Sequence, residues 1–449
     1  MANYLSNTEQ ECKEMLEAIG VPDCDSLYDD IPSKLRCPRL SDEFPKGKSQ
    51  QEVLDEMNGF AAKNTAYRCI MRGAGAYDHY IPSIVKYLAS RSEFLTAYTP
   101  YQAEMSQGIL QSLFEFQTMI CALTGMDVSN ASVYDGASAA AEAAFMCVEK
   151  DKRVVLVPEN VRPQTKSVIR TYLEPRGITV KELTEEEGYI VDGKINRDKL
   201  QSAIDDSVAC FYFEQPNYYG LIEDAKDICK MVHGDNNTAK VIMGCNATSL
   251  ALLKSPRDCG ADIAVGDAQP FGLSLSFGGP YLGFMATLEN KETLRRMPGR
   301  IVGQTTDNNG KRSFVLTLQG REQHIRREKA LSNICSNQAH CALTAAMYLT
   351  AMGKEGLTEV ASNCAALAHY AANEFKKGKT GDAIMKYKGE FFHEFVTVTK
   401  TKADKIVAKC AKLGILAGLP IGKNEILWCF TEKVRKEDID KVAEIMRRA

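Results

Sequence analysis

Residues 260–286 read Gly-Ala-Asp-Ile-Ala-Val-Gly-Asp-Ala-Gln-Pro-Phe-Gly-Leu-Ser-Leu-Ser-Phe-Gly-Gly-Pro-Tyr-Leu-Gly-Phe-Met-Ala. The apolar run at 261–265 predicts a buried strand, a glycine-rich loop follows it, and a second apolar run at 281–288 predicts the next strand. In a protein that alternates strands and helices, ligands bind outside the carboxyl ends of the strands. We therefore expect this loop to lie at the functional edge of a sheet.

The chain before this loop alternates between two patterns. Apolar runs predict strands, and amphipathic stretches between them predict helices; the strands are 153–157, 178–183, 209–213 and 241–245, and the helices 164–173, 197–204 and 222–232. This order predicts an α/β fold with a large, mainly parallel sheet covered by helices on both faces. The last strand, 281–288, also fits an antiparallel direction.

The rest of the chain divides into two further parts. We expect residues 1–67 to form a helical, loop-rich arm, 68–330 the large α/β domain, and 331–449 a connecting helix with a small α+β domain. An arm of this kind could wrap a partner subunit or simply be solvated.

Composition excludes several classes of function. The net charge of −3 gives no basic footprint for nucleic acid, and no apolar run is long enough to span a membrane. The 15 cysteines are scattered and form no Cys-x-x-Cys pair, so a metal ribbon is not expected. Unpatterned cysteines and the lack of a signal-peptide pattern predict a cytoplasmic protein.

A polar cluster at residues 98–107 is one candidate site. Thr99 and Pro100 predict a helix start, an apolar face follows from Met105 to Leu123, and Gly125 ends the helix. A helix start exposes N–H groups that can bind a carboxylate. The candidate residues near this start are Tyr98, Thr99, Tyr101, Gln102, Glu104 and Gln107.

Three other polar features have competing interpretations. The helix start at 135–138 could hold a phosphate, but simple capping is the better reading of that segment alone. For His79 we favour a hydrogen-bonded structural role. The charged run at 321–329, predicted to be helical, is either an anion or partner site or a solvated face, and such runs are usually solvated.

Four stretches together resemble one family, the glycine decarboxylase P-protein of the glycine cleavage system. They are 95–108, 134–138, 276–284 and 321–335. The likeness covers nearly the whole chain, whose length matches the N-terminal half that many bacteria make as subunit 1. The resemblance implies a fold-type I pyridoxal-phosphate (PLP) transferase-like architecture and an α₂β₂ heterotetramer with subunit 2. It also implies an oxidoreductase of glycine catabolism: glycine loses CO₂ on PLP, and its aminomethyl group passes to the lipoyl arm of H-protein.

The family comparison also exposes a missing residue. A PLP enzyme holds its cofactor through a lysine, but residues 258–290 contain none, and the expected position falls near Gln269 and Pro270. Asn246 stands where such enzymes usually place an aspartate against the pyridine nitrogen. We therefore expect no catalytic residue, covalently bound cofactor or metal in this chain, and PLP on the partner subunit.

The same resemblance suggests what the chain contributes. The cluster at 98–107 would form the edge of the partner's active site, near glycine or the lipoyl arm. The side chains of Arg321, His324, Arg326 and Arg327 would hold the subunit interface or guide the acidic H-protein.

Two alternatives remain open. One is an autonomous PLP aminotransferase or decarboxylase that uses another lysine, of which Lys254 is the nearest. The other is a purely structural scaffold subunit.

Overall fold

The computed structural model describes residues 7–36, 47–96, 99–234, 238–377 and 384–448. The chain divides into two units, residues 1–66 and 67–449. In the described part of the first unit, α1 (Glu9–Ile19) begins at a capping box between Thr8 and Glu11 and ends at Gly20, while α2 (Gln50–Ala61) is capped by Ser49. Neither helix buries a residue, and none of residues 7–36 and 47–66 is buried, so the described part of this unit has no core of its own.

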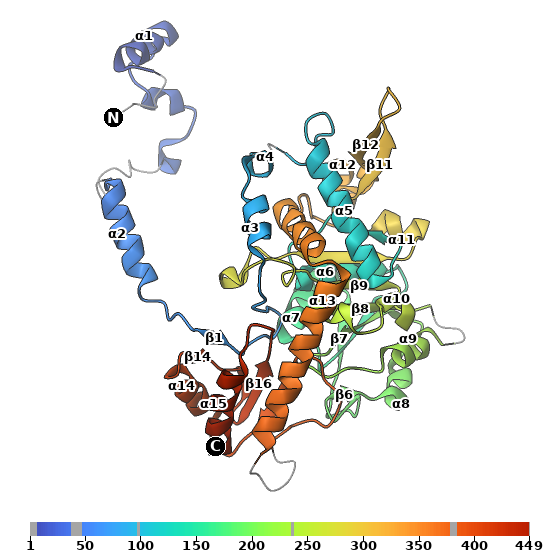
Figure 1. The fold of residues 1–449 in the computed structure, drawn as a ribbon. Helices are drawn as coiled ribbons and strands as arrows, with labels where there is room; N and C mark the ends of the chain where they lie inside the picture. Colours follow the sequence, from blue (N-terminus) through green and yellow to red (C-terminus); the bar gives the residue numbers. More distant parts are fainter. Residues whose placement is uncertain (1–6, 37–46, 97–98, 235–237, 378–383, 449) are drawn as a thin grey trace. The chain divides into compact units, whose positions relative to one another are not determined.

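The second unit is built on a seven-stranded sheet (Figure 1). Its strands lie in the order β2-β10-β9-β8-β7-β3-β4. They are β2 (Val128–Ser129), β3 (Val154–Pro158), β4 (Thr179–Leu183), β7 (Val208–Gln215), β8 (Lys240–Asn246), β9 (Ile263–Asp267) and β10 (Gly283–Thr287). The strands from β4 to β9 are parallel and β10 is antiparallel to both neighbours, which confirms the predicted α/β sheet.

Helices cover both faces of this sheet because its strands are apolar on both sides. On β7, Phe211 and Phe213 face the core that includes α5 (Gln107–Thr124) and α9 (Ala225–His233). Cys210 and Tyr212 face the opposite core, with α6 (Gly136–Cys147) and α7 (Pro163–Leu173). The shorter elements of this domain are α3 (Ser83–Ala89), α4 (Ser92–Leu95), β5 (Ile190–Val191), β6 (Lys194–Ile195), α8 (Arg197–Leu200), α10 (Pro256–Cys259), α11 (Lys291–Arg296) and α12 (Gln323–Arg326).

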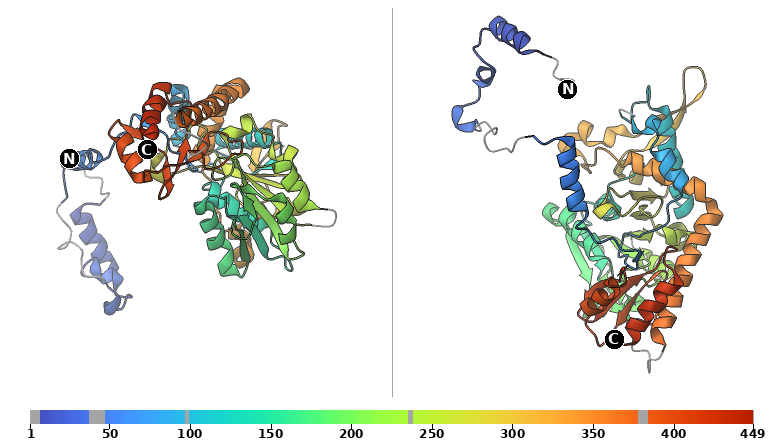
Figure 2. Two further views of the ribbon diagram at one scale, coloured as in Figure 1. Left: turned by 90° about the horizontal axis from the view of Figure 1, so that it is seen from below. Right: turned by 60° about the vertical axis from the view of Figure 1, so that its left-hand side comes forward.

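A long helix leads to the C-terminal domain. Helix α13 (Ala339–Lys376) changes direction at Gly353 and packs on α5 at one end and on α15 (Lys436–Arg447) at the other. The C-terminal elements gather at that second end (Figure 2). They are α14 (Ala403–Ala411), β13 (Glu394–Val398), β14 (Ile415–Leu416), β15 (Leu419–Gly422) and β16 (Glu425–Cys429), and β13, β16 and β15 form an antiparallel sheet.

The segment around residue 70 binds to this C-terminal domain. Strand β1 (Cys69–Ile70) pairs in parallel with β14, and the next residue, Met71, bonds through its backbone to Leu416 and Cys429. This pairing carries the following loop, 73–80, to the carboxyl end of the large sheet.

Three sequence predictions about elements were wrong or incomplete. Helix α5 begins at Gln107; residues 100–101 and 103–105 form turns before it, and Met105 is exposed. The run at 321–329 is not one helix, because Arg327 has a φ of 54° and breaks it. The hairpin of β11 (Val302–Thr306) and β12 (Arg312–Leu316) was not predicted. Among the described residues, no helix combines the length and hydropathy needed to cross a membrane.

Candidate functional site

Polar side chains meet where β7, β8 and β9 end, at the edge of the sheet where such folds bind ligands. Gln215, Asn246 and Asp267 are the last residues of these three strands. The loop 73–80 and the start of β13 close over them, and the hydrogen bonds described below show how.

Gln269 occupies the place where the family comparison puts the cofactor-binding lysine. Its side chain is fully buried. Its Oε1 accepts the Tyr77 N–H at 2.9 Å, and its Nε2 donates to the carbonyls of Tyr77 at 2.9 Å and Leu273 at 2.7 Å. The amide therefore joins two loops, and each of its polar atoms has a backbone partner.

The start of α6 is occupied by the chain's own carboxyl groups. Asp135 accepts the Ser138 N–H at 2.8 Å, so the predicted capping is confirmed. Asp267 accepts the Gly136 N–H at 3.0 Å and the Gln269 N–H at 2.9 Å. Two of the N–H groups that could bind a phosphate at this helix start are thus already used.

Asn246 bonds to a buried histidine and not to a cofactor. Its Nδ2 lies 3.1 Å from His393 Nε2, and its Oδ1 accepts the Ser249 N–H at 3.1 Å. Burial lowers the pKa of His393 well below its ordinary value, so the ring is neutral. A neutral Nε2 that accepts from Asn246 leaves the proton on Nδ1, which is buried without a partner.

A buried carboxyl group closes the other side of this region. Glu394 accepts the Ala74 N–H at 2.7 Å and the Tyr77 hydroxyl at 2.8 Å, and burial raises its pKa to about 7. A Cβ at Gly73 would lie 2.5 Å from Glu394 Oε1, so only glycine fits there. The cavity that remains is about 10 Å³, which holds one water molecule at most.

These contacts test whether PLP fits in this chain. The buried amide of Gln269 occupies the position expected for the lysine, and Asp267 accepts an N–H at the start of α6, where the phosphate would bind. Asn246 stands at the position expected for the aspartate, and the remaining cavity is too small for the pyridine ring. Lys254, the alternative lysine, is exposed and precedes α10. The residues present do not fit the cofactor.

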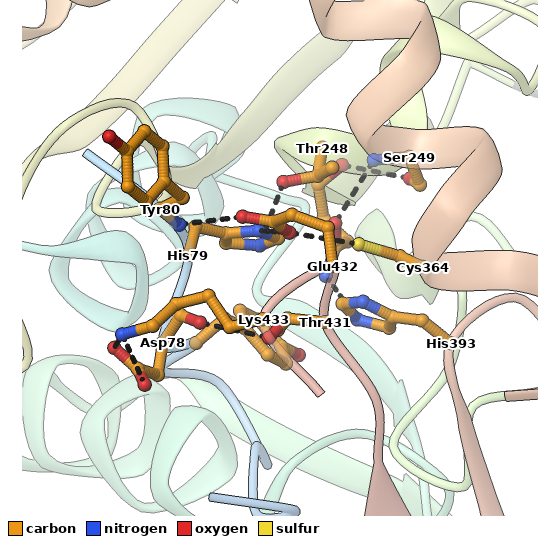
Figure 3. Close-up of polar contacts among 12 residues, drawn as sticks. Asp78, His79, Tyr80, Thr248, Ser249, Cys364, His393, Thr431, Glu432 and Lys433 are labelled. Atoms are coloured by element: carbon orange, nitrogen blue, oxygen red, sulfur yellow. Dashed lines mark hydrogen bonds and ion pairs between the residues drawn. The ribbon is translucent and has the colours of Figure 1, made fainter. Parts of the chain in front are cut away.

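His79 lies in a second cluster nearby, shown in Figure 3. Its Nδ1 is 2.7 Å from Glu432 Oε2, and its Nε2 is 3.3 Å from Thr248 Oγ1. The thiol of Cys364 donates to the same glutamate oxygen at 3.3 Å, and the Tyr80 N–H donates to the other at 2.6 Å. The structural role predicted for His79 is confirmed.

This cluster also offers nitrogen, sulfur and oxygen atoms within 4.8 Å of one another. Each atom already has a hydrogen-bond partner, and burial raises the pKa of the Cys364 thiol far above neutral pH. The cluster is therefore a hydrogen-bonded junction between the loop 73–80, α13 and the segment after β16.

The candidate cluster at 98–107 divides into inward and outward residues. Tyr101 points inward: its hydroxyl bonds to the side chain of Asn337 and accepts the Asn337 N–H at 3.0 Å. The Arg300 guanidinium lies 4.9 Å from its ring centre. Gln107 clamps β12, since its amide exchanges hydrogen bonds of 2.8 and 2.9 Å with the backbone of Phe314.

Two members of the cluster face an open cleft. Thr99 and Gln102 line a cleft of about 380 Å³ beside α4 and the start of α5. Glu104 is exposed and does not line it, and Tyr98 lies outside the described residues. The residues placed to contact a ligand or a partner here are therefore Thr99 and Gln102.

The charged run at 321–329 also splits by position. Arg321 turns inward and donates to the carbonyls of Met297 and, at 2.6 Å, Gly299. His324, Arg326 and Arg327 are exposed, and His324 Nδ1 lies 3.3 Å from Glu322 Oε2. The three exposed side chains remain available to a partner.

Sequence reasoning missed three residues of these sites. Asp267 had a readable signal, because it follows a short apolar run at a strand's carboxyl end. Glu394 and Glu432 had none: each lies in a strand-like or loop segment of the C-terminal domain and meets the loop 73–80 only in the folded chain.

Solved structures of low sequence identity share this fold. The sphingosine-1-phosphate lyase of Burkholderia pseudomallei superposes with a TM-score of 0.62 at 15% identity, over 92% of this chain and 93% of that one. The aspartate aminotransferase of Thermus thermophilus gives 0.58 at 13% identity, over 85% and 98%. The fold is thus that of the fold-type I PLP-dependent enzymes, here with the cofactor position closed.

Relatives of higher sequence identity identify the family. A crystal structure of glycine decarboxylase (P-protein) of the glycine cleavage system, in inhibitor-bound form, has a TM-score of 0.89 and 36% identity over the whole of both chains. Probable glycine dehydrogenase (decarboxylating) subunit 1 of Desulfitobacterium hafniense is 46% identical over 98% of each chain. That of Bacillus cytotoxicus is 46% identical over 99% of this chain and 98% of its own. The sequence model of the glycine cleavage system P-protein matches residues 2–446, and this chain belongs to that family.

Proposed function

We propose that this chain is subunit 1 of a glycine decarboxylase P-protein and binds no PLP itself. A second subunit carries the cofactor, and together they release CO₂ from glycine and pass the aminomethyl group to the lipoyl arm of H-protein. The family and the names of its relatives support the activity. The division of labour between the subunits is our inference from the closed site.

One observation carries this inference, namely the position of Gln269. A lysine there would need a free path to a cofactor, whereas Gln269 is fully buried and bonded on all sides to the backbone. The closed site explains why the reaction needs a partner, and no chemical step is assigned to this chain.

The contribution of this chain then comes from its surface. We place Thr99 and Gln102, which line the 380 Å³ cleft, at the edge of the partner's active site. We assign His324, Arg326 and Arg327 to the interface in an α₂β₂ assembly or to the docking of H-protein. We further propose that the protein is cytoplasmic, in keeping with the free thiols of its described cysteines, and that 67/68 and 330/331 are its domain boundaries.

The first experiment asks which subunit holds the cofactor. The isolated chain is incubated with PLP, dialysed, and its visible spectrum and intact mass are recorded after borohydride reduction. We expect no aldimine absorption and no added mass, while the co-purified complex should show both on the other subunit. Cofactor mass on any lysine of this chain would refute the proposal.

The second experiment separates an active-site edge from a scaffold. Gln102→Ala removes an exposed side chain that makes no hydrogen bond to the described residues, so assembly should be unchanged. If Gln102 faces the partner's site, glycine-dependent CO₂ release falls by about tenfold, the effect of one lost hydrogen bond in a site. Gln201→Ala, an exposed glutamine elsewhere, is the matched control. Full turnover with intact assembly would leave Gln102 outside the site and favour a scaffold role.

A further inference from the structure

A pocket of about 200 Å³ lies between the end of α11 and the segment that follows β12. Residues 295–299 form one wall, and residues from the broken charged run and the segment after it form the other. This basic pocket is distinct from the closed cofactor position and from the cleft at Thr99.

The basic pocket has an excess of positive charge. Its charged lining consists of five cations and one carboxylate: Arg295, Arg296, Arg321, Arg326, Lys329 and Glu322. Glu322 pairs through its Oε2 with Arg300 and His324, whereas its Oε1 is buried without a hydrogen-bond partner, so one negative charge stands against the five cations of the lining. Among the described residues, none of the five cations lies within ion-pair distance of a carboxylate.

Two of these arginines also hold unused donors in buried positions. The Nε atoms of Arg296 and Arg321 are buried and have no hydrogen-bond partner. Their guanidinium groups are fixed by other bonds, from Arg296 to the Val148 carbonyl and from Arg321 to the carbonyls of Met297 and Gly299. Buried donors without acceptors are rare in folded proteins and call for a partner.

Burial also destabilises the charged form of Arg321. Burial lowers the pKa of Arg321 to about 10; the Glu322 carboxylate opposes this shift, and the like charge of Arg300 adds to it. An anion in the pocket would offset this repulsion. Within the described part of the chain, Arg326 is bonded only through its Nε, to the Gly320 carbonyl at 3.1 Å, and the exposed Lys329 side chain has no hydrogen-bond or ion-pair partner.

We propose that the basic pocket binds a phosphate-type oxyanion, either inorganic phosphate or the phosphate group of a small monoester. Several arginine forks and a lysine around one small volume match the multiple acceptor oxygens of a dianion better than a single carboxylate. Arg326 and Lys329 contact the anion from the exposed side, and Arg296 and Arg321 fix the inner wall. This site does not depend on the role proposed above in glycine cleavage.

The test is calorimetric titration of the full-length chain with inorganic phosphate, and separately with phenyl phosphate, at constant ionic strength in chloride. We expect saturable one-site binding, weakened about tenfold by Arg326→Gln and by Lys329→Gln, the effect of one charge-assisted contact. Tighter binding of phenyl phosphate than of phosphate would identify a monoester site, and the reverse order a site for the free anion.

Arg327→Gln is the matched control, because this exposed neighbour does not line the pocket. It removes the same charge and should change the affinity less than twofold. Binding that does not saturate, or an Arg327→Gln loss equal to that of Arg326→Gln, would mean attraction to a basic surface without a site and would overturn the proposal. Circular dichroism and melting of each variant confirm that the fold is intact.

Discussion

Replacing Gln269 by lysine restores the amine that PLP enzymes use, at the place where the family comparison expects it. The change is informative because it tests whether the missing amine alone keeps the cofactor out. The contacts of Gln269 predict that it does not. The new lysine would enter a sealed position, and the N–H groups at the start of α6 would still be bonded to Asp135 and Asp267.

The cost of this substitution can be worked from the contacts that Gln269 makes. A lysine can donate to the carbonyls of Tyr77 and Leu273, but it cannot accept the Tyr77 N–H. A buried N–H without an acceptor costs about 1–3 kcal/mol. A buried ammonium adds a penalty that cannot exceed the cost of deprotonating the lysine at pH 7, which is about 4–5 kcal/mol. Together these two costs should lower the free energy of unfolding by about 1–8 kcal/mol.

Two measurements check this prediction. Urea unfolding gives the free energy, and the visible spectrum after incubation with PLP reports any aldimine, which should be absent. Gln201→Lys makes the same chemical change at an exposed position and should alter stability by less than about 0.5 kcal/mol. A Gln269→Lys protein as stable as the parent, or one that turns yellow with PLP, would refute the account of this site.

Two further predictions concern buried acids. Burial raises the pKa of Glu394 from 4.5 to about 7, so the stability due to its protonated form is present below pH 4.5 and is lost as the pH rises to 7. Relative to wild type, Glu394→Gln should therefore gain up to about 3 kcal/mol between pH 5 and pH 8 in denaturant titrations, with Glu390→Gln, a change at an exposed neighbour, as the matched control. Glu432→Gln should lower the free energy of unfolding by about 2–3 kcal/mol at pH 7, because it removes the carboxylate charge to which His79, the Tyr80 N–H and the Cys364 thiol all bond. An unchanged urea midpoint would show that these contacts add no stability.

The large sheet could be predicted because most of its strands correspond to short apolar runs in the sequence. The central parallel strands are short apolar runs buried on both faces, so 209–213 and 241–245 were found within a few residues of β7 and β8. The antiparallel direction of β10 was left open because a short apolar run carries no sign of direction. It is fixed by pairing with both β9 and β2.

The start of α5 shows how distant contacts override local signals. Thr99 and Pro100 are a good helix start by composition, yet the helix begins at Gln107. Tyr101 explains the difference, because its hydroxyl bonds to Asn337 and its ring lies against Arg300, and these contacts hold Tyr101 outside the helix. The β11–β12 hairpin had a local signal, the Asn-Gly pair at 309–310, which was not used.

The candidate sites could be predicted only in part, because some of their residues follow local patterns and others meet only in the folded chain. Gln269 and Asn246 were found by comparing this chain with enzymes that need other residues there, so the sequence alone exposed the losses. The contacts that fill this region of the fold could not be predicted from the sequence. Tyr77 lies more than 300 residues before His393 and Glu394, and the pairing of β1 with β14 holds its segment against theirs in the folded chain.

The closed site also explains why a single mutation should not reopen it. Gln269 holds the loop 73–80 through Tyr77, the same loop is held by Glu394, and Asp267 holds both the start of α6 and the Gln269 backbone. Each residue at the cofactor position thus has a second attachment elsewhere, so changing one leaves the others in place and unpairs a buried group. Creating a cofactor position here would therefore require several coordinated changes, because each single change leaves the other contacts in place.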